Sequence, residues 1–121
     1  MAREIETKCI HLEEEENSIN HYGAISYPIY QSATYAHPGV GQSTGYDYSR
    51  LQNPTREHLE KTVASLENGI DALAFSSGMA AITLMMELFK PGDHLIVDAD
   101  LYGGSIRLFN HVSEKNGIEF S

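Results

Sequence analysis

The sequence predicts a parallel α/β domain that is preceded by an extended arm. From residue 54 onward, segments with helical periodicity alternate with short apolar segments typical of strands. Residues 19–53 are instead rich in Tyr, Ser, Gly and Pro, and they lack sustained helical periodicity. We therefore expect an extended arm over residues 1–55 and the first part of an α/β domain over residues 56–121.

The arm is unusual because a segment this long without regular structure is rare inside a compact monomer. Aromatic residues are favoured at interfaces between proteins. We therefore expect the arm to lie across another subunit, and its tyrosines are Tyr22, Tyr27, Tyr30, Tyr35, Tyr46 and Tyr48.

The first helix of the domain has clear start and stop signals. Asn53-Pro54 predicts its start, because Asn caps free amides and Pro is tolerated in the first turn. Asn68-Gly69 predicts its end. Between them, Leu59 and Val63 fall with Leu66 on one face, which we expect to pack against the core.

The rest of the domain repeats this alternation. The expected elements are a strand over 72–75, a turn over 76–78, a helix over 79–89, a strand over 94–97, a loop over 98–104, a helix over 105–114 and a strand over 118–120. The helix over 79–89 is apolar on nearly all sides, which predicts that it is buried. A parallel sheet this small leaves long unpaired edges, so we expect the chain to be a fragment of a larger folding unit.

Composition excludes several classes of partner. Lys and Arg total 8 against 17 for Asp and Glu, and the net charge of -9 disfavours nucleic acid and anionic membranes. The first eight residues contain no apolar run that could serve as a secretory signal. Cys9 is the only cysteine, so no internal disulfide can form. We expect a cytoplasmic protein.

The sharpest local motif is Phe75-Ser76-Ser77-Gly78-Met79-Ala80, where a strand is expected to run directly into a helix. Such a turn presents free backbone amides and the positive end of a helix dipole to an anion. The serine hydroxyls can donate hydrogen bonds as well, and Gly78 permits close approach of the backbone. An ordinary tight turn capped by serine explains the same residues.

Two further motifs suit a flat, phosphorylated ligand. Arg50 can bind phosphate oxygens through its fork of donors, and Tyr48 can add a hydrogen bond. A surface ion pair of Arg50 with Asp47 is the alternative. Tyr102, followed by two glycines at the expected end of a strand, can stack on a flat ring. The alternative is that Tyr102 packs on the protein itself.

Other kinds of site find no support. The six histidines lack the paired spacing of a zinc site, so we expect no bound metal. Nucleophile-elbow, dinucleotide-binding and P-loop motifs do not occur in the sequence.

Taken in order, the motifs resemble the Cys/Met-metabolism family of enzymes that depend on pyridoxal 5'-phosphate (PLP). The resemblance is carried by Tyr48-Ser49-Arg50, Asn53-Pro54-Thr55, Ser77-Gly78-Met79-Ala80-Ala81 and Tyr102-Gly103-Gly104-Ser105, and it extends into the arm. This family includes cystathionine γ-synthase, cystathionine γ-lyase and methionine γ-lyase. The resemblance implies the amino-terminal part of an aminotransferase-like (fold type I) large domain, in an enzyme that forms a dimer of dimers.

The resemblance also implies roles for individual residues. Ser77, Gly78 and Met79 would bind the PLP phosphate. Tyr48 and Arg50 would reach that phosphate from a neighbouring subunit. Tyr102 would stack on the pyridine ring and take part in proton movement. The Schiff-base lysine of the family lies well downstream in complete enzymes, and none of the four lysines here has its context: Lys8, Lys61, Lys90 and Lys115.

The implied activity is γ-replacement or γ-elimination on a small amino-acid substrate of the cystathionine, homoserine-ester or methionine type. The segment from Tyr102 to Ser105 is more similar to the cystathionine enzymes, which favours a γ-synthase or γ-lyase. Two alternatives remain. The chain is a truncated, non-catalytic remnant without the Schiff-base lysine, or it is an α/β anion-binding module unrelated to PLP.

Overall fold

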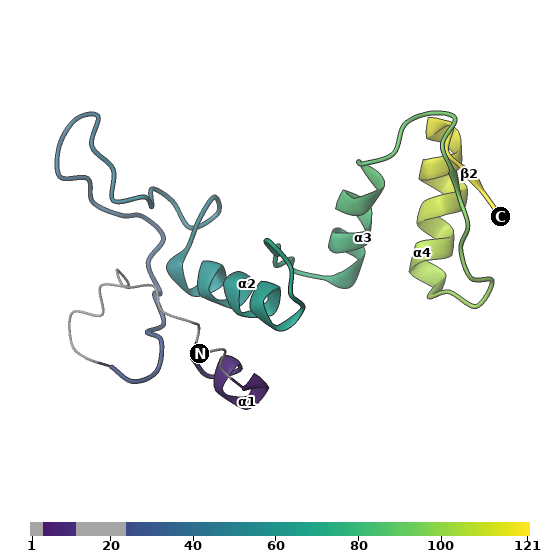
Figure 1. Ribbon diagram of the computed structural model, residues 1–121. Helices are drawn as coiled ribbons and strands as arrows, with labels where there is room; N and C mark the ends of the chain where they lie inside the picture. The colour runs from purple at the N-terminus through teal and green to yellow at the C-terminus, as the bar shows by residue number, and fades with distance from the viewer. Residues whose placement is uncertain (1–3, 12–23) are drawn as a thin grey trace. The chain divides into compact units, whose positions relative to one another are not determined.

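The computed structural model describes residues 4–11 and 24–121, so Tyr22 lies outside the described residues. The chain divides into two compact units, residues 1–74 and residues 75–121. The ribbon is shown in Figure 1. Helix α2 (Pro54–Leu66) belongs to the same unit as the arm, and the boundary expected between residues 55 and 56 stays a prediction.

In the first unit, the arm is irregular but folds back on itself. After the short helix α1 (Ile5–Lys8), residues 24–53 form no helix and only isolated bridges, one of them between Thr34 and Tyr48. The N–H of Ser49 donates to the carbonyl of Ala33 at 2.9 Å, close to that bridge. The expectation of an arm without regular structure is confirmed for these residues. Its place across another subunit stays a prediction.

Helix α2 (Pro54–Leu66) begins and ends where the sequence predicts. The side chain of Asn53 caps it by accepting a hydrogen bond from the N–H of Thr55 at 2.9 Å. Beyond its end, Asn68 has a φ of 54°, the left-handed conformation that stops a helix. The expected apolar face is not covered, since Leu59 is 54% exposed and Val63 is 41% exposed.

The second unit is built from α3 (Gly78–Met86), β1 (His94–Leu95), α4 (Gly103–Leu108) and β2 (Glu119–Phe120). The helical path of α4 continues as a π-turn, η1 (Phe109–Ser113), and a 3₁₀ turn, η2 (Glu114–Asn116). Strands β1 and β2 pair in parallel, with His94 opposite Glu119. The parallel sheet is therefore confirmed, and α4 with its two turns forms the crossover between the strands.

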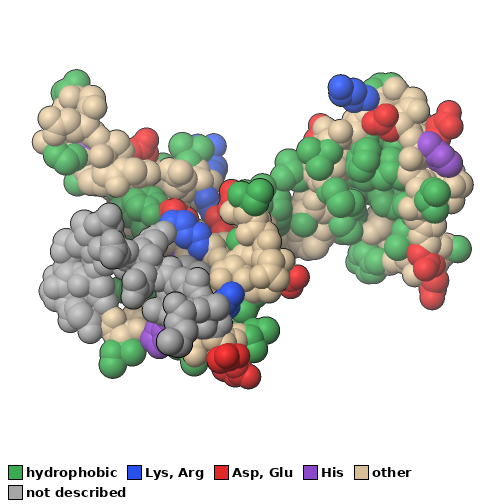
Figure 2. Space-filling model, viewed as in Figure 1, with side chains coloured by type: hydrophobic (Ala, Val, Ile, Leu, Met, Phe, Trp, Pro, Cys, Tyr) green, Lys and Arg blue, Asp and Glu red, His purple; other side chains and the backbone are tan. Residues whose placement is uncertain are grey.

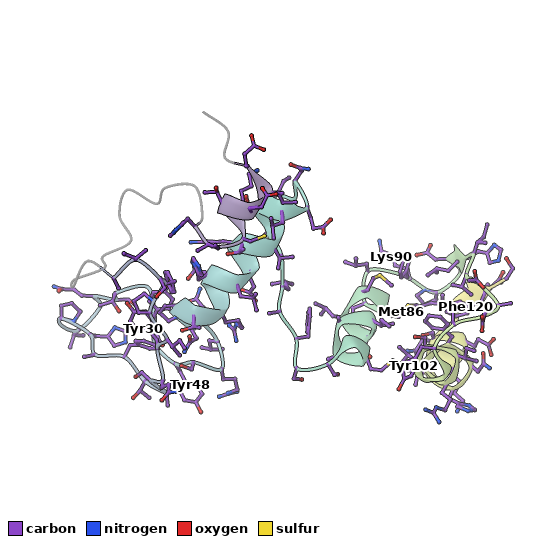
Figure 3. The ribbon with its side chains drawn as sticks, turned by 90° about the horizontal axis from the view of Figure 1, so that it is seen from below. Tyr30, Tyr48, Met86, Lys90, Tyr102 and Phe120 are labelled. Atoms are coloured by element: carbon purple, nitrogen blue, oxygen red, sulfur yellow. The ribbon has the colours of Figure 1, made fainter. Side chains whose placement is uncertain are left out.

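The core of the second unit lies between the two helices and the sheet. Met86 of α3, Phe109 of η1 and Ile118 are buried together. Phe109 stacks on Phe120 of β2, with the ring centroids 4.6 Å apart. Figure 3 labels Met86 and Phe120 in this core. Helix α3 is thus held in the core by Met86 at its carboxyl end, and the amino end of the helix is left accessible.

Three expectations about individual elements were wrong. Residues 72–75 form no strand, because a strand needs a neighbour and the described residues provide none. The N–H of Ala74 instead donates to a carboxylate oxygen of Glu60 at 2.8 Å. Strand β1 has two residues where four were expected, and α4 starts at Gly103, two residues before the predicted start.

Helix α3 also departs from the prediction, since it ends at Met86 and only that residue is buried. Leu84 and Met85 are 45% and 48% exposed. Figure 2 shows hydrophobic side chains gathered on the viewed face of this unit, over α3 and α4. A helix that is apolar on all sides needs partners on all sides, and two short strands and one crossover cover only part of it. Among the described residues, no helix has the length and apolar character needed to span a membrane.

Candidate cofactor site

The amino terminus of α3 offers a set of unused donors. Ser77, with extended backbone angles (φ -158°, ψ 157°), caps the helix by accepting a hydrogen bond from the N–H of Ala80 at 3.1 Å. Gly78 and Met79 occupy the first turn, where backbone N–H groups have no partner inside the helix. The structure gives these two N–H groups no hydrogen bond within the described residues. Because the Ser77 oxygen accepts from Ala80, its own proton remains free to be donated to another group.

The space beside this helix start is open. A Cβ atom built on Gly78 would meet no atom within 4 Å. The two alternatives that the sequence left for this turn are therefore compatible: Ser77 is an ordinary cap, and the same turn has two amides without a hydrogen-bond partner next to the open position at Gly78. Such a helix start favours an anion through its dipole and its free N–H groups.

Tyr102 and Met79 are brought together at Gly104. A Cβ atom on Gly104 would lie 2.5 Å from Cε1 of Tyr102 and 3.0 Å from Sδ of Met79, so both side chains border this one position. The hydroxyl of Ser105 donates to the same sulfur at 3.9 Å, which links α4 to the first turn of α3. Tyr102 is nevertheless 71% exposed, which leaves its side chain accessible for stacking. Figure 3 labels Tyr102 at the start of α4.

Tyr48 and Arg50 lie in the first unit and contact each other. The guanidinium carbon of Arg50 is 5.3 Å from the centroid of the Tyr48 ring, a cation–π distance. Asp47, the alternative partner for Arg50, instead pairs with His37 at 3.2 Å and accepts a hydrogen bond from Ser43 at 3.1 Å. Within the described residues Arg50 forms no ion pair, so its charge is available to a ligand.

A hydrogen-bonded network holds the loop that carries Tyr48 and Arg50. The amide nitrogen of Asn53 lies 3.0 Å from the Ser49 hydroxyl, 3.1 Å from the carbonyl of Tyr30 and 3.1 Å from the hydroxyl of Tyr35. Arg56 donates to backbone carbonyls on both sides of Arg50. The sequence predicted Asn53 as a helix cap and as part of the Asn53-Pro54-Thr55 motif, but it did not predict this network and gave Arg56 no role.

A second polar cluster ties the arm to α2. The hydroxyl of Tyr46 donates to Glu57, which also pairs with Lys61 at 2.7 Å. Partial burial, together with the hydrogen bond to Glu57, raises the pKa of Tyr46 well above its usual value. The ion pair with Lys61 and the hydrogen bond from Tyr46 lower the pKa of the Glu57 carboxyl. Glu57 is therefore a charged acceptor that fixes Tyr46 on the helix.

The sequence-predicted residues fall into two groups. Ser77, Gly78, Met79 and Tyr102 belong to the second unit, and Met79 and Tyr102 are neighbours there. Tyr48 and Arg50 belong to the first unit and are neighbours in it. No three His, Cys, Asp or Glu residues within 4–11 and 24–121 are grouped to hold a metal ion.

Comparison with known proteins decides the family. Residues 6–121 match the sequence profile of the Cys/Met metabolism PLP-dependent enzymes. The chain belongs to this family. Relatives within the Cys/Met metabolism family include the cystathionine gamma-synthase/O-acetylhomoserine (thiol)-lyase of Bacillus subtilis, which is 50% identical over 120 residues, 99% of this chain and 32% of the relative.

The cystathionine gamma-lyase of Bacillus subtilis is 55% identical over 97 residues, which cover 80% of this chain and 26% of that protein. A crystal structure of cystathionine gamma synthase from Xanthomonas oryzae pv. oryzae, in complex with aminoacrylate and cysteine, matches with a TM-score of 0.85 at 35% identity. The match covers 100% of this chain and 31% of that one. The expected fold class, part of the fold type I large domain, is confirmed. The chain spans between about a quarter and a third of the length of these relatives.

PLP, the cofactor of the Cys/Met metabolism family, is a flat pyridine ring that carries a phosphate. The residues of the second unit fit both parts of it. The unpaired N–H groups of Gly78 and Met79 and the hydroxyl of Ser77 suit the phosphate, and the open space at Gly78 leaves room for it. The exposed face of Tyr102, next to Met79, suits the ring.

Proposed function

We propose that this chain provides the phosphate-binding and ring-stacking part of the cofactor site in an enzyme that performs γ-replacement or γ-elimination. Its substrates are small amino acids of the cystathionine, homoserine-ester or methionine type, and the activity is that of a cystathionine γ-synthase or γ-lyase. The observation that carries the proposal is the position of Tyr102 beside Met79, at a helix start whose first amides are unpaired.

Each predicted site residue has a role in this proposal. The N–H groups of Gly78 and Met79 and the hydroxyl of Ser77 hold the phosphate, and the ring of Tyr102 lies on the pyridine. Tyr48 and Arg50 bind the phosphate from a neighbouring subunit, which requires the working form to be a homo-oligomer. The family resemblance implies that this homo-oligomer is a dimer of dimers. The free charge of Arg50 supports this role, because an unpaired guanidinium can form a charge-assisted bond to phosphate.

When bound, PLP supplies an electron sink for the reaction at the amino acid. The residues of this chain hold and orient the cofactor, and the hydroxyl of Tyr102 takes part in proton movement as substrate binds; the exposure of Tyr102 supports this role. A cytoplasmic setting is part of the proposal, because Cys9 is the only cysteine and needs no oxidising compartment.

A non-catalytic chain is the alternative, and the lysines favour it for these residues taken alone. Lys61 is engaged with Glu57, Lys8 lies in α1 and Lys115 lies in η2. None of the four lysines, Lys90 included, has the context of the family's catalytic lysine. Incubation of the chain with PLP, followed by borohydride reduction and an intact-mass measurement, should therefore give no stoichiometric adduct on any one lysine. A specific adduct on one of these lysines would contradict the assignment.

The affinity for PLP tests the main proposal in a chimeric enzyme. In this chimera, residues 1–121 replace the matching segment of the cystathionine gamma-synthase/O-acetylhomoserine (thiol)-lyase of Bacillus subtilis. Arg50→Ala should weaken PLP binding about 10- to 100-fold, the effect of losing one hydrogen bond to a charged group. Arg107→Ala, which removes another exposed arginine that has no proposed role, is the matched control. Equal PLP affinity in the two variants would refute the role of Arg50.

A further inference from the structure

Arg56 on α2 forms hydrogen bonds to the backbone on both sides of Arg50. Its Nη1 lies 3.4 Å from the carbonyl oxygen of Ser49, and its Nη2 donates to the carbonyl of Leu51. Arg50 is the residue between these two carbonyls. With the carbonyls before and after it held by one side chain, the backbone of Arg50 is fixed relative to α2.

Glu60 holds Arg56 in place from one turn further along the helix. The Nε of Arg56 is 3.6 Å from Oε1 of Glu60, and the Glu60 side chain is only 16% exposed. The same oxygen accepts the N–H of Ala74 at 2.8 Å. Glu60 is thus fixed by a segment outside the helix, and through Glu60 the guanidinium of Arg56 is fixed in turn.

A plain helix-surface ion pair does not explain this arrangement. The other pair at the same spacing on α2, Glu57 with Lys61, is more exposed, with side chains 36% and 43% accessible. Arg56 instead directs its donors to two backbone carbonyls and one carboxylate, a use that requires the planar fork of arginine. Lysine carries all its donors on one nitrogen, which cannot take the place of the three separate nitrogens through which Arg56 contacts these acceptors.

We propose that Arg56 and Glu60 form a positioning pair for the phosphate-binding residues Tyr48 and Arg50. Glu60 orients Arg56, and Arg56 fixes the carbonyls of Ser49 and Leu51, so that the guanidinium of Arg50 is presented in one direction. The inference rests on the proposed role of Arg50, and it adds two residues of α2 that contact neither cofactor nor substrate.

The test is a double-mutant cycle on PLP affinity in the chimeric enzyme. Arg56→Lys, which keeps the charge and loses the fork, should weaken PLP binding about tenfold, part of the effect of removing Arg50. In an Arg50→Ala background the same substitution should change PLP affinity less than twofold, because Arg56 acts through Arg50. An equal loss in both backgrounds would show a general structural effect and overturn the proposal.

Amide hydrogen exchange on the cofactor-free chimera supplies a readout that does not depend on activity. Arg56→Lys should speed exchange of the N–H groups of Ser49 and Leu51, which bond to Ala33 and Tyr48, and leave residues 103–121 unchanged. Unchanged exchange at Ser49 and Leu51 would overturn the proposal. If Arg56→Lys does not fold, Glu60→Gln replaces it, because the amide oxygen can still accept from Ala74.

The outcomes separate this inference from the function on which it rests. Loss of affinity in Arg50→Ala without loss in Arg56→Lys would remove the positioning role and keep the role of Arg50. No loss in Arg50→Ala would remove both roles in cofactor binding.

Discussion

The ring of Tyr102 occupies the space that a methyl group on Gly104 would need. A Cβ atom there would lie 2.5 Å from Cε1 and 3.0 Å from Cδ1 of the ring. Contacts under 3 Å between carbon atoms are strongly repulsive, so the observed ring position requires glycine at 104. Gly103, the preceding residue of α4, has no such neighbour, since a Cβ atom there would meet nothing within 4 Å.

Gly104→Ala should therefore move Tyr102 at little cost in stability. Tyr102 is 71% exposed, so its ring can rotate away, and alanine is favoured over glycine in a helix by roughly 0.5–1 kcal/mol. We expect an unchanged or slightly raised melting temperature of the chimeric enzyme, together with PLP binding weakened about tenfold by the loss of ring stacking.

Gly103→Ala is the matched control for this substitution, because it gives the same gain in helix propensity next to open space. Its PLP affinity and cofactor absorbance spectrum should equal those of the parent chimera. If Gly104→Ala also retained both, the position of Tyr102 would not matter for the cofactor.

Ser77→Ala should affect both stability and cofactor binding. It removes the acceptor for the N–H of Ala80, which costs about 1 kcal/mol as a lost helix cap, and it removes a hydroxyl from the proposed phosphate site. Ser76→Ala is the control, since the Ser76 side chain forms no hydrogen bond in the described part of the chain. Urea unfolding and PLP titration of the two variants check this, and equal behaviour of both would contradict the site.

The sequence predicted the elements that depend on local signals. Side-chain chemistry within a few residues predicted the caps at Asn53 and Ser77 and the end of α2 near Asn68. The spacing of alternating helices and strands predicted the parallel pairing of β1 and β2. The strand expected over 72–75 failed because strand formation depends on a neighbour, which sequence periodicity cannot supply.

Contacts between residues far apart in the chain could likewise not be predicted from the sequence. The network from Asn53 to Tyr30 and Tyr35 joins residues 18 or more positions apart. The spacing of Arg56 and Glu60 signals a helix-surface pair, but the backbone carbonyls that Arg56 reaches depend on how the arm folds back. The approach of Tyr102 to Gly104 depends on the turn that starts α4.

Substitutions at Asn53 can separate its two roles. Asn53→Asp keeps an oxygen that caps Thr55 and removes the amide donors to the arm, whereas Asn53→Ala removes both. We expect the aspartate variant to keep the helix, measured by circular dichroism, and to bind PLP more weakly because Ser49 loses a partner. Alanine should cost about 1 kcal/mol more in unfolding free energy. Parent-like PLP binding by the aspartate variant would rule out a role of this network in cofactor binding.

The cluster of Glu57, Tyr46 and Lys61 should make the stability of the contact between the arm and α2 depend on pH at acidic pH. The ion pair with Lys61 and the hydrogen bond from Tyr46 hold the pKa of Glu57 in the folded protein below its ordinary value of 4.5. Because the folded state favours the ionised form, the contribution of Glu57 is complete above pH 4.5 and is lost as the pH falls through the lower, folded-state pKa.

Glu57→Gln keeps an oxygen for Tyr46 and cannot ionise, so it isolates this contribution. The difference in unfolding midpoint between the parent chimera and Glu57→Gln should be constant from pH 7 to about 5.5 and should shrink below pH 4.5. Urea unfolding at several pH values measures it. A difference that stayed constant down to pH 3 would mean that the charge of Glu57 does not stabilise the contact between the arm and α2.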